Sequence, residues 1–120
     1  MITVSTANFT VDSHFAGKDP VVRQIYDCLL DKLAAIGPVT VDPKKTSIHL
    51  NNVSALAGVA TRKSYLLLNI KSNRKLDSPR IHKSEQISAG RFHQEVKLTQ
   101  VADIDEELMG WLRAAYNLSS

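Results

Sequence analysis

SIHLNNVSALAGVATRKSYLLLNI, residues 47–70, decides the fold of this 120-residue chain. Ile48 and Leu50 alternate with polar side chains, which is the period-two pattern of a β-strand with one buried face. Two more apolar strands follow, separated by short polar turns. The expected strands and turns are 48–50, 51–52, 54–60, 61–63 and 64–70. Short turns join antiparallel neighbours, so the stretch predicts three antiparallel strands.

The same period extends to both sides of this stretch. Val39 and Val41 predict a short strand after Pro38, with a turn over residues 42–45. Residues 71–90 are polar and contain Pro79 and Gly90, so we expect mostly loop, with a short edge strand near Ile81. A final strand is expected where apolar Phe92, Val96 and Leu98 alternate with polar residues.

Two helices flank the strands. Asp19 is a candidate N-cap before Pro20, and Gly37-Pro38 follows the last apolar residue of a helical stripe. That stripe consists of Val22, Ile25, Tyr26, Leu29, Leu33 and Ile36. The second helix is expected from Asp103, with Glu106 completing a capping box, to about Tyr116. Its stripe consists of Ile104, Leu108, Trp111, Leu112 and Ala115.

These elements predict one α+β domain over residues 12–118, in the order α-β-β-β-β-β-α. We expect an antiparallel meander sheet of about five strands, flanked by the N-terminal and C-terminal helices on one face. Residues 1–11 are expected to form an N-terminal tail or an added edge strand. The first residues lack a basic n-region and a long apolar stretch, so we expect no signal peptide.

The composition is that of a globular protein, with 43% hydrophobic and 22% charged residues. Cys28 is the only cysteine, which excludes an intramolecular disulfide and is typical of a reducing compartment. We therefore expect a soluble, cytoplasmic protein without a membrane partner.

Charge is unevenly distributed along the chain. Residues 1–60 carry five basic and five acidic side chains, residues 61–100 nine and three, and residues 101–120 one and four. The middle of the chain is therefore basic and its end acidic, although the formal net charge is only +3.

Most enzymatic chemistries lack their usual signatures. The histidines show no metal-ligand spacing, and neither a Gly-rich phosphate loop nor a nucleophile elbow is present. We expect no metal, no cofactor and no catalytic residue. His49 and His93 fall on polar strand faces and could be neighbours, but we interpret them as solvated.

Glu95-Val96-Lys97 is the fragment that could belong to an enzyme. Glu95 and Lys97 share a sheet face, as in metal-dependent nucleases, where the carboxylate binds Mg²⁺ and the lysine lies near the phosphate. The neighbouring strands offer no second carboxylate, so a salt bridge explains the pair better. A nuclease-like enzyme stays an alternative.

Basic residues gather at predicted strand ends. In a meander the 44–46 and 61–63 turns lie at one end of the sheet, which we call the basic end. Cations with hydroxyl groups beside them suit phosphate or another anion. The candidate binding residues are Lys44, Lys45, Thr46, Arg62, Lys63, Tyr65, Arg80 and His93. We therefore expect a non-enzymatic module that binds an anion, with nucleic acid as one candidate.

The alternative from a different class is a protein-interaction or dimerisation module. It would use an exposed sheet face or an edge strand over residues 54–60, whose small side chains permit close approach.

Several segments together resemble a known family, among them HFAGK (14–18), GPVTV (37–41), KTSI (45–48), GVATRK (58–63), LDSPR (76–80) and Phe92-His93. Further matches are Asp103-Ile104-Asp105, Trp111-Leu112 and Ala115-Tyr116. From about Asp12 to Tyr116 the chain resembles the bacterial family called domain of unknown function 5655. The resemblance implies a compact α+β module without an established activity. Members occur alone or as the tail of larger proteins, some labelled as predicted transport proteins.

The chain departs from that family in the predicted hairpin. Relatives tend to carry aromatic residues near positions 50 and 56, where this chain has Leu50 and Leu56. A base-stacking role at these two positions is therefore not implied here.

Overall fold

The computed structural model describes residues 9–120. Residues 1–8, which make up most of the expected tail or edge strand, lie outside the described residues. Residues 9 and 10 are exposed and precede a short helix, α1 (Val11–Phe15). Thr10 caps α1: its Oγ1 accepts a hydrogen bond from the backbone N–H of Ser13 at 3.1 Å.

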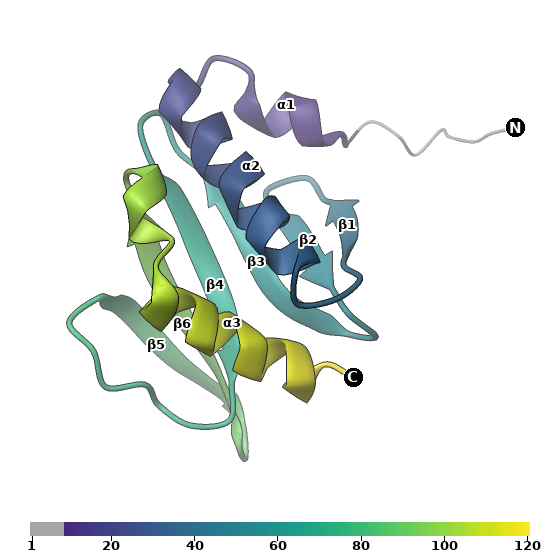
Figure 1. The fold of residues 1–120 in the computed structure, drawn as a ribbon, viewed down its shortest axis with the longest axis vertical. Coiled ribbons are helices and arrows are strands. Elements are labelled where there is room, and N and C mark those ends of the chain that lie inside the picture. The colour runs from purple at the N-terminus through teal and green to yellow at the C-terminus, as the bar shows by residue number, and fades with distance from the viewer. Residues whose placement is uncertain (1–8) are drawn as a thin grey trace, which may run out of the picture.

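Six antiparallel strands form one sheet in the order β1-β2-β3-β4-β6-β5 (Figure 1). The strands are β1 (Thr40–Pro43), β2 (Ile48–Asn51), β3 (Ala55–Thr61), β4 (Leu66–Ser72), β5 (Ile81–Ser88) and β6 (Arg91–Leu98). The predicted fold class is confirmed. The first four strands form the expected meander, and the edge strand expected near Ile81 is the eight-residue β5.

The last two strands exchange places relative to a simple meander. After β4 the chain passes to the sheet edge to form β5, and β6 then returns between β4 and β5. Buried Gln94 on β6 fixes this crossing, because its Nε2 donates to Ser72 Oγ at 3.0 Å and to the Arg74 carbonyl at 3.1 Å. Leu76, in the segment that joins β4 to β5, is only 8% exposed and anchors that segment to the rest of the protein.

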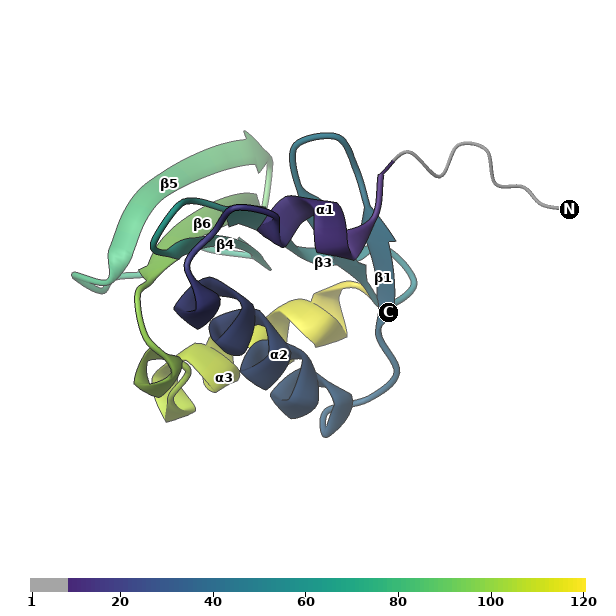
Figure 2. The same cartoon turned by 90° about the horizontal axis from the view of Figure 1, so that it is seen from above.

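Two long helices, α2 (Pro20–Ala34) and α3 (Glu106–Leu118), cover one face of the sheet (Figure 2). Their apolar stripes and the inward residues of β2, β3, β4 and β6 form a single core. Its largest fully buried side chains are Ile25, Leu29, Leu33, Ile48, Leu50, Leu56, Leu66, Leu68, Ile70, Leu98, Ile104 and Leu108. Burial of this apolar surface is the main contribution to folding.

Asp19 and Pro20 begin α2 as predicted. The predicted start of the second helix is wrong, because Asp105 is the N-cap of α3 and its carboxylate accepts from Leu108 N at 3.1 Å. Asp103 instead ends a short 3₁₀ turn, η1 (Val101–Asp103), and its Oδ2 accepts from the backbone N–H groups of Thr99 and Gln100. Both aspartates are good N-cap residues, so the sequence pattern could not separate the two turns.

The other face of the sheet is not covered by α2 or α3, and we call it the open face (Figure 2). A β-bulge at the β2–β3 pairing places Leu56 and Ala57 together in the core. Leu50 and Leu56 are both fully buried, so aromatic residues at these positions would lie inside the protein.

The expectation of an edge strand over residues 54–60 is wrong. β3 lies inside the sheet between β2 and β4, and the two edges are β1 and β5.

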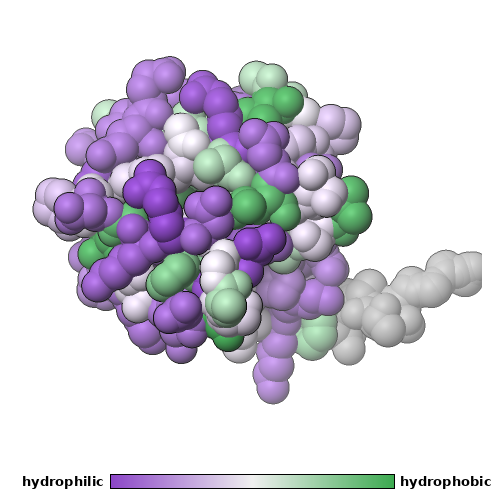
Figure 3. All heavy atoms as spheres, turned by 90° about the horizontal axis from the view of Figure 1, so that it is seen from below, coloured by the Kyte–Doolittle hydropathy of each residue, from purple (hydrophilic) through white to green (hydrophobic). Residues whose placement is uncertain are grey.

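Figure 3 views the end of the molecule that contains the β2–β3 turn, where hydrophilic side chains dominate and apolar groups are scattered. Val53 in that turn is 82% exposed. No helix within residues 9–120 is both long and apolar enough to cross a membrane.

Candidate binding surface

The basic end forms because the 44–46 and 61–63 turns meet at one end of the sheet, where Ile48 pairs with Val59. Helix α1 lies against both turns. His14 Nε2 donates to the Lys44 carbonyl at 2.7 Å, and Thr61 Oγ1 donates to the His14 carbonyl at 2.5 Å. The predicted proximity of the two turns is therefore present, and α1 fixes them to each other.

Two predicted cations at this end already have partners. Lys63 Nζ lies 3.2 Å from Asp19 and donates to the Gly17 carbonyl at 3.1 Å, so it holds the loop between α1 and α2. Lys44 Nζ lies 2.9 Å from Asp42 on β1. These exposed pairs are worth little in stability, but they reduce the charge available to a ligand.

Arg80 joins the start of β5 to the start of α3. Its guanidinium donates to Asp105 at 2.7 Å, to Glu107 at 3.2 Å and to the Asp103 carbonyl at 2.6 Å. Burial alone would lower the pKa of Arg80, but its hydrogen bonds to the two carboxylates outweigh burial and raise it. Arg80 therefore connects the sheet to the start of α3, and its charge is already paired with two carboxylates.

The remaining residues of the basic end are accessible. Lys45, Thr46 and Arg62 are exposed, and neither cation has a carboxylate within ion-pair distance among residues 9–120. Tyr65 lies beside Lys97, whose Nζ is 4.3 Å from the ring centroid. Lys97 was part of the basic region in sequence but not of the candidate site. It extends the basic end onto the open face.

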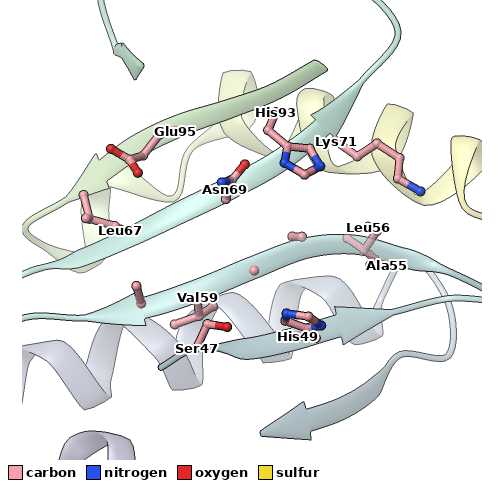
Figure 4. A pocket seen from close by; sticks show the side chains of 13 residues that line it. Ser47, His49, Ala55, Leu56, Val59, Leu67, Asn69, Lys71, His93 and Glu95 are labelled. Carbon is pink, nitrogen blue, oxygen red and sulfur yellow. The ribbon is translucent and has the colours of Figure 1, made fainter. Parts of the chain in front are cut away.

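His93 does not belong to the basic end. It pairs with Lys71 on β4 and with Glu85 on β5, further along the open face. There it lines a hollow of about 260 Å³ (Figure 4). His49 lines the same hollow from β2, so the two histidines share one site but stand on strands separated by β3 and β4.

The hollow exists because β3 carries only small side chains on the open face. Ala55, Gly58 and Ala60 form its floor. Larger side chains, among them His49, Asn69 and His93, rise from the strands on both sides (Figure 4). A Cβ built on Gly58 would have no atom within 4 Å. The walls consist of Ser47, His49, Leu67, Asn69, Lys71, His93 and Glu95.

One row of paired residues crosses the hollow. His49 is opposite Gly58, Gly58 opposite Asn69, and Asn69 opposite Glu95. Asn69 Oδ1 is buried and lacks a hydrogen-bond partner among the described residues. A buried amide oxygen without a partner is unfavourable, so this oxygen costs the folded protein some stability.

Glu95 and Lys97 share the open face, as their spacing predicted. Glu95 Oε1 lies 3.7 Å from His82 Nε2, which makes it part of an ion pair whenever that histidine is protonated. Within residues 9–120 no group of three or more His, Cys, Asp or Glu side chains is arranged to hold a metal ion.

The hollow itself was not expected from the sequence. The sequence feature that corresponds to it is the spacing of Ala55, Gly58 and Ala60. We interpreted these small residues as part of an edge strand that a protein partner could approach closely. In an interior strand the same small residues leave a trough between taller neighbours.

The described residues thus define an α+β protein with one helix-covered sheet face and one open face. The chain belongs to the family domain of unknown function (DUF5655), whose model matches residues 11–119. The resemblance seen in the sequence motifs is therefore confirmed. Comparison with curated proteins and with solved structures found no match. The family name assigns no activity, so any functional argument depends on the surface described above.

Proposed function

We propose that this protein is a binding module that holds single-stranded nucleic acid on the open face of its sheet. The observation that supports this most is the continuity of the hollow with four cations that belong to no ion pair among residues 9–120. Lys71 lines the hollow, Lys97 lies beside Tyr65 toward the basic end, and Lys45 and Arg62 are exposed at that end. An anion on this surface would displace water without breaking an existing ion pair at these four side chains.

The two parts of the surface suit the two parts of a nucleotide. The floor of Ala55, Gly58 and Ala60 offers an apolar area, and the Asn69 side chain adds a polar residue to the wall beside it. Cations beside such a floor are suited to phosphate groups. Nucleic acid in single strands provides both parts repeatedly, and it binds through rings and positive grooves without a sequence code. Tyr65, His49 and His93 are rings on this face that a base could contact.

Fluorescence anisotropy of labelled single-stranded DNA and RNA, titrated at several salt concentrations, tests the proposal. Lys97→Glu should weaken binding roughly tenfold and reduce the salt dependence, because each phosphate contact contributes about 0.7 to the logarithmic slope. Lys75→Glu is the matched control. Lys75 is exposed and stands between Arg74 and Leu76, which line a groove beside α3 and hence lie on the helical side.

Gly58→Val tests the hollow separately from the charges. Its backbone φ is not in the left-handed region, and the new side chain would enter open space, so the fold should be retained. We expect weaker binding of the oligonucleotide with an unchanged salt slope. Gly110→Val, on exposed helix surface with no atom within 4 Å of the new Cβ, is the control for the same replacement away from the hollow.

Any of three results would reject the proposal. One is the absence of salt-sensitive binding of any single strand by the unmodified protein at low salt. Another is equal affinity in Lys97→Glu, Gly58→Val and their controls, with circular dichroism showing native folds. Binding of mononucleotides but not of longer strands would also reject it, because the site would then not recognise a chain of phosphates.

Arg62→Glu is a further variant that tests the basic end. It is preferable to any change at Lys63, because Lys63 holds the α1–α2 loop.

A further inference from the structure

The two edges of the sheet differ in how well they are protected. β1 has four residues and ends in Pro43, which are features that discourage pairing with another chain. β5 has eight residues, contains neither proline nor glycine, and is exposed along most of its length. Ile87, near its end, is 51% exposed. A long exposed edge strand is a template for further β-pairing.

The sequence of β5 is complementary to itself when reversed. Its first seven residues read Ile81-His82-Lys83-Ser84-Glu85-Gln86-Ile87. When two copies pair antiparallel about Ser84, Lys83 of each copy is opposite Glu85 of the other, and His82 is opposite Gln86. Register shifts after Ile81 and after Gln86 leave residues 83–86 as a regular segment between two bulges.

The charged residues of this segment lie on one face. Lys83 pairs with Glu95 and Glu85 pairs with His93 in the β5–β6 register, and Glu95 and His93 both line the open face. Within residues 9–120 neither Lys83 nor Glu85 belongs to an ion pair. Both charges are therefore available to a partner strand.

The same charges exclude the neighbouring registers. A shift by two residues in one direction places Lys83 opposite its own counterpart, and a shift in the other direction does so for Glu85. Opposite charges directly across an antiparallel pair are favourable, while like charges are unfavourable. A shift by one residue would place the charged side chains on opposite faces. The register centred on Ser84 is the one that satisfies both charges.

We propose that this protein forms a homodimer in which β5 of one copy pairs antiparallel with β5 of a second copy, centred on Ser84. The dimer joins two six-stranded sheets edge to edge. A two-fold axis perpendicular to the sheet relates the copies, so both open faces lie on the same side. This proposal is independent of the nucleic-acid proposal, because the edge of β5 does not contribute to the hollow.

Charge reversal with rescue is the decisive experiment. Sedimentation velocity should show a concentration-dependent dimer for the unmodified protein, and monomer for Lys83→Glu and for Glu85→Lys. The exchange Lys83→Glu with Glu85→Lys in one chain restores opposite charges across the axis and should restore the dimer. An equimolar mixture of the two single variants should form a heterodimer for the same reason. Lys75→Glu, away from this edge, should leave the dimer unchanged.

Cross-linking provides a second readout that does not depend on affinity. Directly opposite antiparallel residues have Cα atoms about 4.5–5.5 Å apart, which is within disulfide range. Ser84→Cys in a Cys28→Ser background should therefore form a covalent dimer on mild oxidation. Ser64→Cys in the same background, exposed in the β3–β4 turn, should not.

A monomer at every concentration, without cross-linking through Ser84→Cys, overturns the proposal. A dimer that persists in both single reversals overturns it as well, because the interface then lies elsewhere. Thermal unfolding of each variant verifies that a monomeric result does not come from loss of the fold. Oligonucleotide binding by a fully monomeric protein would leave the nucleic-acid proposal standing while this one fails.

Discussion

Gly37→Ala should destabilise the protein although the backbone at this position does not require glycine. Gly37 follows α2, and its φ is not in the left-handed region. The aromatic ring of Tyr116 from α3 lies directly over it, so a Cβ would overlap the hydroxyl group and come within 2.8 Å of Cζ. The Tyr116 hydroxyl donates to the Pro38 carbonyl at 2.9 Å, so the ring is not free to move without losing that bond.

The expected magnitude combines three effects. Displacing the ring is an overpacking effect of about 1–3 kcal/mol, and loss of the hydrogen bond costs about 1 kcal/mol. Restriction of the unfolded chain offsets about 0.4–1 kcal/mol. The free energy of unfolding should therefore fall by about 1–3 kcal/mol. For a domain of this size that corresponds to a decrease of Tm by roughly 4–12 °C.

Urea unfolding followed by the fluorescence of Trp111, the only tryptophan, measures this change. Gly110→Ala is the opposite case, because it lies inside α3 with open space at its Cβ, and should stabilise by about 1 kcal/mol. In a Tyr116→Ala background the ring is absent, so Gly37→Ala should become neutral or stabilising. If Gly37→Ala has the same effect in both backgrounds, the steric argument is refuted.

Three further changes follow from the core and from the turn before α3. Tyr26→Phe should leave stability within about 0.5 kcal/mol or increase it, because the buried hydroxyl has no partner among the described residues; urea unfolding decides this, and a loss above 1 kcal/mol would contradict it. Leu56→Ala should destabilise by about 2–5 kcal/mol, since the bulge turns this residue into the core; a thermal midpoint equal to that of the unmodified protein would show that it does not pack there. Burial would raise the pKa of Asp103, but hydrogen bonds from Thr99 and Gln100 outweigh burial and hold the pKa below 3.8. The ionised carboxylate therefore stabilises the fold above that pH, and this stabilisation is lost as the pH falls through the lowered pKa. Asp103→Asn should therefore be less stable at pH 7, with a difference that closes toward the lowered pKa in urea titrations over a pH series; a constant difference across the series would exclude this linkage.

The sequence predicted those elements whose residues alternate between a buried and an exposed side. Such patterns occur in β2, β3, β4, β6 and both long helices, because each of them buries one face against the common core. β5 was expected only as a short strand, since at the sheet edge neither of its faces is well buried and its residues are mostly polar. Helix α1 was missed because five residues are too few to show a helical period.

The candidate site was predicted in part, for a related reason. The distribution of charge along the sequence predicted the basic end. It could not predict which cations form ion pairs within the protein, as Lys63 and Arg80 do. The hollow depends on which strands flank β3, and that order is a property of the whole sheet. Local periodicity contains no information about the insertion of β6 between β4 and β5.

That insertion also determines the order in which the fold can be completed during synthesis. β4 contains the apolar run Leu66–Leu68, yet its second neighbour, β6, is the last strand of the chain to be made. Until Arg91–Leu98 leaves the ribosome, β4 is a bare sheet edge rich in leucine, which is the kind of segment that recruits other chains. A chain truncated anywhere between residues 73 and 90 keeps that edge permanently, and should aggregate although four strands and α2 are intact. The integrity of β6 therefore matters for the solubility of the newly made protein as much as for its final stability.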